Sequence, residues 1–264
     1  MRSYTGNVDV KKSETDTPEQ QAAVAAAWPA MLQNIAVISI CPERLANCKT
    51  RLGPLWSYAR VVDGVNGRHI NVKELKRAGK YRDLNKWNSM RRGEIGCFMS
   101  HRQAWLTHME GKAPEAPEAA PEDVASAAAA AAAAAAKRAM SDYMLILEDD
   151  ADMTPSRNLL KYLQTCLDQL GSATAWDVLF IARNPRLCRI GGKFTENIVV
   201  ARKTWGLFAY VVTREAAARL YDESRCMRQP VDVFLSTLPG IRKCALDPIP
   251  FTVVPVPSDT IGIK

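Results

Sequence analysis

The N-terminal part of the chain contains a strand, a helix and a second strand in close succession, and this order restricts the fold more than any other feature. The apolar run NIAVISI at 34–40 predicts a buried strand, and Pro42 suits the first turn of a helix that continues to about Leu52. The segment SYARVVDG at 57–64 predicts a second strand. A strand, a helix and a strand in this order indicate a parallel βαβ unit. We therefore expect an α/β domain.

A third apolar run ends in a dense group of carboxylates. The segment LILEDDAD at 145–152 is typical of a buried strand, and its acids are Glu148, Asp149, Asp150 and Asp152. At neutral pH these acids repel one another, and the carboxyl end of a strand in an open α/β sheet is where ligands bind. Mg²⁺ or Mn²⁺ commonly joins such carboxylates to a substrate's phosphates, which is the chemistry of a nucleotide-sugar site. The alternative is a helix cap, because Pro155 and Ser156 resemble a helix start.

The remaining patterns fit one domain. The chain has 264 residues, of which 47% are hydrophobic, and this composition excludes a disordered protein. We expect one domain over 30–264 with a mixed, mainly parallel sheet, preceded by a flexible tail over 1–29. The further elements expected are a helix at 93–109, a strand at 176–182, a hairpin within 187–203, a strand at 207–213, and helices after Thr213 and Pro230.

An alanine-rich segment at 113–139 interrupts the domain. It begins with alternating Pro, Glu and Ala and becomes an unbroken alanine run at 127–136. Alanine favours helix but offers little surface to bury. We expect a spacer, made of a flexible Pro-rich strap and a solvent-exposed helix that Lys137 and Arg138 cap.

Four motifs occur in an order that resembles glycosyltransferase family 25. They are GEIGCFMSHRQAW at 93–105, LILEDDA at 145–151, TWG at 204–206 and PVD at 230–232. The chain is similar to the lipooligosaccharide β-galactosyltransferases and the collagen β-galactosyltransferase domains from about Asn34 onward. The resemblance implies a glycosyltransferase-A (Rossmann-like) fold, UDP-galactose as donor and Mn²⁺ or Mg²⁺ as cofactor, with inversion at the anomeric carbon.

The same resemblance assigns roles to individual residues. It implies that Glu148 and Asp150 bind ribose and metal, that Asp149 faces the donor sugar, and that Asp232 is the general base. The family usually has an aromatic residue after the glycine of TWG, whereas this chain has Leu207, so the sugar-pocket contacts differ. The remaining nucleotide-sugar-binding candidates are Ile40, Arg44, Asp63, Ser100, His101, Trp205, Gly206, Ser258 and Asp259.

The sequence leaves alternative roles open for several single residues. Asp152 could replace Glu148, because Asp150 and Asp152 also form an Asp-x-Asp pair. Asp232 could simply cap its helix, and His101 could be structural or brace the acidic loop. Cys97, His101 and His108 share a helical stripe, but without a fourth ligand we do not predict a zinc site from these three.

Charge and cysteine usage limit the other function classes. The net charge is +7, and the basic residues are densest at 73–92, which predicts a solvated loop or one that faces an acceptor or phosphate. No recognised motif supports specific nucleic-acid binding. The seven cysteines contain no CxxC pair, and neither a signal peptide nor a membrane span is visible, so we expect reduced thiols and a cytoplasmic protein.

Together these observations predict an inverting, metal-dependent glycosyltransferase. We expect transfer of galactose from UDP-galactose to a hydroxyl of a glycan or of a hydroxylysine-type protein acceptor. UDP-glucose or UDP-N-acetylglucosamine is the alternative donor. A catalytically silent glycan- or nucleotide-binding module is the alternative class.

Overall fold

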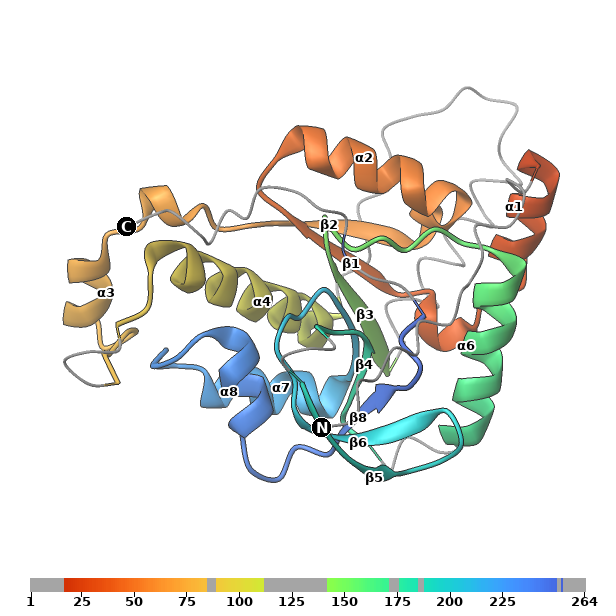
Figure 1. Cartoon of the computed structure of the whole chain (residues 1–264). Helices are drawn as coiled ribbons and strands as arrows, with labels where there is room; N and C mark the ends of the chain where they lie inside the picture. Colours follow the sequence, from red (N-terminus) through yellow and green to blue (C-terminus); the bar gives the residue numbers. More distant parts are fainter. Residues whose placement is uncertain are drawn as a thin grey trace.

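A single eight-stranded sheet forms the centre of the molecule (Figure 1). The computed structural model describes residues 17–84, 89–111, 142–170, 176–184, 188–250 and 253. Along the sheet the strand order is β2-β1-β3-β7-β4-β8-β6-β5. The strands are β1 (Ile35–Ser39), β2 (Ala59–Asp63), β3 (Tyr143–Glu148), β4 (Val178–Ala182), β5 (Arg189–Lys193), β6 (Ile198–Lys203), β7 (Ala209–Thr213) and β8 (Lys243–Leu246).

Strand directions confirm the βαβ unit but not a mainly parallel sheet. β1 runs parallel to both β2 and β3, and β4 runs parallel to β8. β7 is antiparallel to β3 and β4, and β6 is antiparallel to β5 and β8. The sheet is therefore mixed as expected, whereas the expectation that parallel pairs would predominate is wrong. The hairpin expected within 187–203 is present as β5 and β6.

Helices cover both faces of the sheet, as Figure 1 shows for α2 and α4 on opposite sides of β1. Alternate residues of a strand point to opposite faces, so Ile146 joins one core and Leu145 and Leu147 join the other. The first core contains α4, α7 and α8, and the second contains α1, α2 and α6. The helices, including 3₁₀ turns (η), are α1 (Pro18–Ala26), η1 (Ala30–Leu32), α2 (Pro42–Leu52), η2 (Gly53–Tyr58), η3 (Gly67–His69), α3 (Val72–Arg77), α4 (Arg92–Glu110), α6 (Arg157–Leu170), α7 (Arg214–Glu223) and α8 (Val231–Thr237).

The N-terminal segment differs from the tail expected over 1–29. From residue 17 onward it is ordered, because Thr17 caps α1 through a capping box with Gln20. Val24 and Trp28 are 3% and 2% exposed and pack into the second core. The domain therefore begins before residue 30. Residues 1–16 and the insertion at 113–139 lie outside the described residues, so the flexible tail and the spacer expected there stay predictions.

Two glycines bring the loop after β2 against α4. A Cβ on Gly67 would lie 2.5 Å from the Arg92 carbonyl oxygen, and a Cβ on Gly96 would lie 2.4 Å from the Val65 carbonyl oxygen. Such distances are far shorter than ordinary van der Waals contact, so only glycine fits both positions. This close approach sets where α4 stands relative to the ends of the central strands.

Candidate active site

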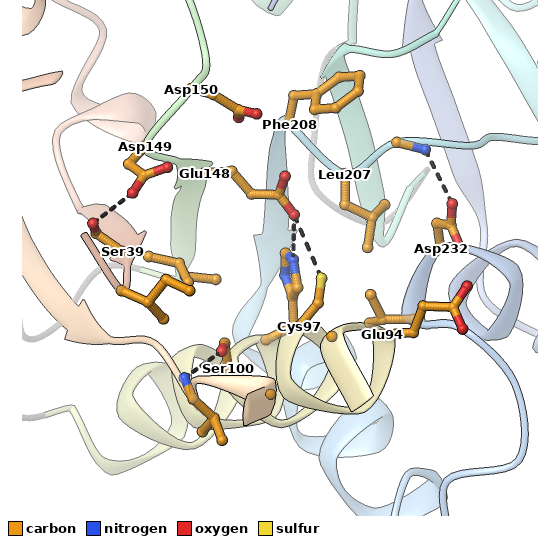
Figure 2. A pocket seen from close by; sticks show the side chains of 18 of the residues that line it. Ser39, Glu94, Cys97, Ser100, Glu148, Asp149, Asp150, Leu207, Phe208 and Asp232 are labelled. Carbon is orange, nitrogen blue, oxygen red and sulfur yellow. Dashed lines mark hydrogen bonds and ion pairs between the residues drawn. The ribbon is translucent and has the colours of Figure 1, made fainter. Parts of the chain in front are cut away.

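A cavity opens at the edge of the sheet where β1 and β3 end (Figure 2). These parallel neighbours bring their carboxyl ends together, which is where open α/β sheets bind ligands. The cavity has a volume of about 290 Å³, at the lower end for small-molecule sites. Its walls come from both strand ends, α4, the segment 206–208 and the start of α8. The predicted residues that line it are Ile40, Arg44, Ser100, His101, Glu148, Asp149, Asp150, Gly206 and Asp232.

Other predicted residues lie outside this lining. Asp63 is exposed at the end of β2. Trp205 precedes the lining residue Gly206, and Lys203 Nζ lies 4.4 Å from the centre of its ring. Asp152, the alternative partner of Asp150, does not line the cavity as the described residues define it. Ser258 and Asp259 lie outside the described residues, so their closing loop stays a prediction.

Asp149 lies in the acidic loop at the end of β3 (residues 148–152), and its contacts hold this loop against the region around the end of β1. Its carboxylate accepts a hydrogen bond from Ser39 Oγ at 2.5 Å and pairs with Arg44 Nη2 at 2.5 Å. Its backbone carbonyl accepts from Arg51 Nη2 at 2.6 Å. The residue is 2% exposed, so this pairing satisfies a charge that would otherwise be costly to bury. Both carboxylate oxygens thus have protein partners, although the sequence suggested a contact with the donor sugar.

Glu148 is held by a chain of buried hydrogen-bonding groups. His101 Nε2 lies 3.1 Å from Glu148 Oε1, and His101 Nδ1 lies 2.9 Å from the Tyr210 hydroxyl. Trp105 Nε1 donates to that hydroxyl at 3.0 Å. Because an indole only donates, the Tyr210 hydroxyl can donate its own proton to Nδ1, which leaves Nε2–H to donate to Glu148. The Trp105 indole, the Tyr210 hydroxyl and the His101 imidazole thereby fix the direction of the Glu148 carboxylate.

Asp150 is the least satisfied acid in the cavity. Its Oδ1 atom is buried and has no hydrogen-bond partner among the described residues. Burial, followed by the charges of Glu148 and Asp149, raises the pKa of Asp150 to about 7. A cation bound at this oxygen would give the buried acceptor a partner and reduce the repulsion among the three acids. The oxygen donors of Glu148 and Asp150 therefore fit a hard divalent metal.

Asp232 closes the opposite wall of the cavity. Its Oδ2 accepts from the Gly206 backbone N–H at 3.2 Å, and its Oδ1 accepts from the Val233 N–H at 2.7 Å. Figure 2 shows Asp232 across the cavity from Glu148. Gly206 has a φ of +82°, and a Cβ there would lie 2.5 Å from the Phe208 ring, so the turn requires glycine. Asp232 thus positions this turn while it faces the cavity.

The helix α4 contributes further residues to the wall of the cavity. Ser100 Oγ accepts from the Val65 N–H at 2.8 Å and donates to the Gly96 carbonyl at 2.8 Å, so it fastens the loop after β2. Glu94 and Cys97 also line the cavity, and the sequence reasoning did not assign them to the site. Burial, followed by the charge of Glu148, raises the pKa of the Cys97 thiol well above its usual range. Both residues lie in the GEIGC motif, so that motif was the signal that could have identified them.

Features outside the cavity bear on the remaining expectations. The basic stretch at 73–92 is not a loop throughout, because Asn71 caps the helix α3, which covers its first residues. Lys76 of this helix pairs with Asp83 at 2.5 Å and lies 5.5 Å from the centre of the Tyr81 ring. All seven cysteines are free thiols. None of the helices in the described ranges combines the length and apolar character that crossing a bilayer requires.

Comparison with known proteins places the chain among one group of relatives. No protein-family model matches it. It is 27% identical over 216 residues to the rat protein named probable inactive glycosyltransferase 25 family member 3, covering 77% of this chain and 32% of the relative. It is 23% identical over 235 residues to human procollagen galactosyltransferase 2, covering 84% of this chain and 33% of the relative.

A third relative is the mimivirus procollagen lysyl hydroxylase and glycosyltransferase, with 25% identity over 180 residues that cover 68% of this chain and 17% of the relative. The chain spans about a third or less of the length of these relatives. The resemblance that the four motifs predicted is confirmed: the curated homologues of this chain are members of the glycosyltransferase 25 family.

Proposed function

We propose that the chain is an inverting, metal-dependent galactosyltransferase with a glycosyltransferase-A type of fold. It would use UDP-galactose and transfer the sugar to a hydroxyl of a glycan or of a hydroxylysine-type protein acceptor. One observation carries the proposal: Asp150, whose buried Oδ1 has no hydrogen-bond partner in the described part of the chain, lines the same cavity as Glu148 and Asp232. Such a cavity suits a ligand that brings both a cation and a reacting hydroxyl.

Glu148 and Asp150 are the residues that would hold Mn²⁺ or Mg²⁺. When bound, the metal neutralises charge that develops on the leaving diphosphate. Glu148 is already oriented by His101, so one ligand would be preorganised before the metal arrives. Ile40 and Arg44 line the same wall near the end of β1, and we assign them to the nucleotide.

Asp232 is assigned to the proton transfer. In a single displacement, the acceptor oxygen forms a bond to the anomeric carbon while the bond from that carbon to the diphosphate oxygen breaks. The hydroxyl proton passes to a carboxylate, a role that typically contributes 10²- to 10⁴-fold. Asp232 lies across the cavity from the metal-binding pair, and its two backbone donors keep the carboxylate in place.

The relatives support the proposed galactose transfer, and the names of some of them also point to the alternative, a catalytically silent module. Human procollagen galactosyltransferase 2 supports galactose transfer, whereas the rat and mouse relatives are named probable inactive or inactive. A silent module that binds nucleotide or glycan would keep the cavity without turning over a donor. Donor turnover, rather than binding, therefore separates the two functions.

The test is donor hydrolysis measured with UDP-galactose, UDP-glucose and UDP-N-acetylglucosamine, each with Mn²⁺ and with a chelator. We expect UDP release to be fastest with UDP-galactose, to require the metal and to be lost in Asp150→Asn. Asp222→Asn is the matched control, because Asp222 is exposed, lies outside the cavity lining and forms an ion pair with Arg225, three residues further along the chain. UDP binding without turnover of any of the three donors would favour the silent module.

A further inference from the structure

Three side chains that are typical metal ligands meet at the wall of the cavity. Cys97 and His101 stand one helical turn apart on α4, so they share a face of that helix. Glu148 reaches them from the end of β3. Glu148 Oε1 lies 3.7 Å from Cys97 Sγ and 3.1 Å from His101 Nε2, and the three ligand atoms all lie within 4.8 Å of one another. Figure 2 shows the contacts of Glu148, including the one to Cys97.

The ligand types favour a zinc-type metal over a hard one, and the separations are compatible with tetrahedral geometry. With usual zinc–ligand bond lengths, tetrahedral geometry places S, N and O ligands about 3.3–3.6 Å apart. Shifts of a few tenths of an ångström would bring the two measured separations to these values. Thiolate and imidazole are ligands that zinc and cobalt prefer, whereas Mg²⁺ and Mn²⁺ prefer carboxylate oxygens. The set therefore differs in chemistry from the Glu148 and Asp150 pair.

The surroundings of His101 suit metal ligation. A ligating histidine usually donates its other N–H to a fixed partner, which holds the ring in place. His101 Nδ1 lies 2.9 Å from the Tyr210 hydroxyl, which has a second lone pair besides the one that accepts from Trp105 Nε1. On metal binding the imidazole proton would move from Nε2 to Nδ1, and the thiol would release one proton to solvent.

We propose that Cys97, His101 and Glu148 form a binding site for one borderline divalent cation of the zinc type. All three residues line the cavity, so a fourth ligand, such as water, could reach a bound cation from the cavity. This is the arrangement of zinc sites that keep one position open to water or substrate. The proposal does not depend on the proposed function, because it concerns metal binding without donor or acceptor.

The test is a Co²⁺ titration of metal-free protein, without UDP or sugar, followed by the thiolate-to-cobalt charge-transfer absorption. We expect wild type to bind one equivalent with this absorption. Cys97→Ser should lose the absorption and weaken Co²⁺ binding at least about 100-fold, because removing even an outer partner of a metal ligand costs 10- to 100-fold. Cys226→Ser is the matched control, since Cys226 is a partly buried free thiol that does not line the cavity; it should behave as wild type.

The absence of thiolate absorption in wild type, or its persistence in Cys97→Ser, would overturn the proposal. A second measurement needs no variant. X-ray absorption of the zinc-loaded wild-type protein should show one sulfur ligand at about 2.3 Å together with nitrogen and oxygen ligands. A shell with only nitrogen and oxygen ligands would overturn the assignment of Cys97.

Discussion

At the residue scale, Asp149 and Asp150 are neighbours in the chain with opposite environments. Asp149 is paired with Arg44 and bonded to Ser39, whereas one oxygen of Asp150 is buried without a partner among the described residues. Asp149 therefore stabilises the metal-free fold, and Asp150 destabilises it when ionised. Asp149 is held by protein groups, whereas Asp150 is the acid that the proposed function assigns to the metal.

This difference predicts how stability depends on pH. The folded-state pKa of Asp150 is raised from 3.8 to about 7, so the folded protein binds this proton more tightly than the unfolded chain does. Metal-free wild type should lose stability as pH rises from about 4 to 7 through this group, with the full penalty present above 7. Asp150→Asn cannot ionise, so at pH 8 it should be more stable than wild type by about 1–3 kcal/mol.

Urea unfolding in the presence of a chelator, at pH 4.5 and at pH 8, measures this difference. The gain of Asp150→Asn should shrink toward zero at pH 4.5. An equal gain at both values of pH would show that packing, rather than charge, explains the effect of the substitution.

Asp232 allows a separate prediction about turnover. If it accepts the proton, Asp232→Asn should lower kcat by about 10²- to 10⁴-fold and leave the affinity for UDP-sugar unchanged. If it only positions the Gly206 turn, loss of the Oδ2 contact should instead raise KM with little change in kcat. Steady-state kinetics and UDP-sugar binding on this variant distinguish the two roles. Near-normal kinetics would exclude both the proton-accepting role and the positioning role of Asp232.

The sequence predicted the acids of the cavity better than their roles. The strand pattern was enough to place Glu148 and Asp150 at a strand end, because strand ends are local features. The partners of these acids come from residues about 50 to 110 positions away, as with the Ser39–Asp149 and His101–Glu148 contacts. No local pattern shows such partners, so the contacts that hold Asp149 could not be predicted. Its contact with the donor sugar, which the family resemblance implies, stays a prediction.

At the element scale, the position of α4 depends on two glycines, because a side chain at either one would collide with the neighbouring backbone. Gly96 and Gly67 let the loop after β2 lie against the helix, and Ser100 fastens that loop by its hydroxyl. The helix then presents Glu94, Cys97 and His101 to the cavity. The motif that identified the family is therefore also the motif that packs the loop.

A methyl group at Gly96 should disturb this packing. Its Cβ would lie 2.4 Å from a backbone carbonyl oxygen, which cannot move aside as a flexible side chain can. We expect Gly96→Ala to lower the free energy of unfolding by about 1–3 kcal/mol. Gly192→Ala is the control, since nothing lies within 4 Å of its Cβ position. Equal urea midpoints for the two variants would contradict the account of α4.

The elements themselves were largely predictable, but the helices α1 and α3 were not, and α3 lies in the basic stretch that was expected to be a loop. Continuous apolar runs at β1, β3 and β4 were enough to identify buried strands, since every residue of β1 and β4 is buried. The helix α1 was missed because its alanines and glutamines show weak amphipathic character. Its place in the core depends on Val24 and on Trp28 just beyond its end. A single tryptophan after a polar segment gives too little periodicity to reveal a packed helix.

At the scale of the whole molecule, the sheet combines a parallel half with a mixed half. The parallel βαβ part supplies the ends of β1 and β3, and the antiparallel strand β7 brings residues 206–208 to the same edge. Sequence patterns identify strands but not their neighbours, so the insertion of β7 between β3 and β4 could not be predicted. That insertion brings Gly206, just before β7, to the edge where β3 ends, and Gly206 donates its N–H to Asp232 of α8.

The central claim is that this edge binds a nucleotide diphosphate together with a divalent metal held by Asp150. Calorimetric titration of UDP, with Mn²⁺ and with a chelator, tests it on wild type, Asp150→Asn and the exposed control Asp222→Asn. We predict that Mn²⁺ strengthens UDP binding by about 5- to 150-fold in wild type and in the control, and not in Asp150→Asn. Equal UDP affinity with and without metal in the wild-type protein would contradict the account.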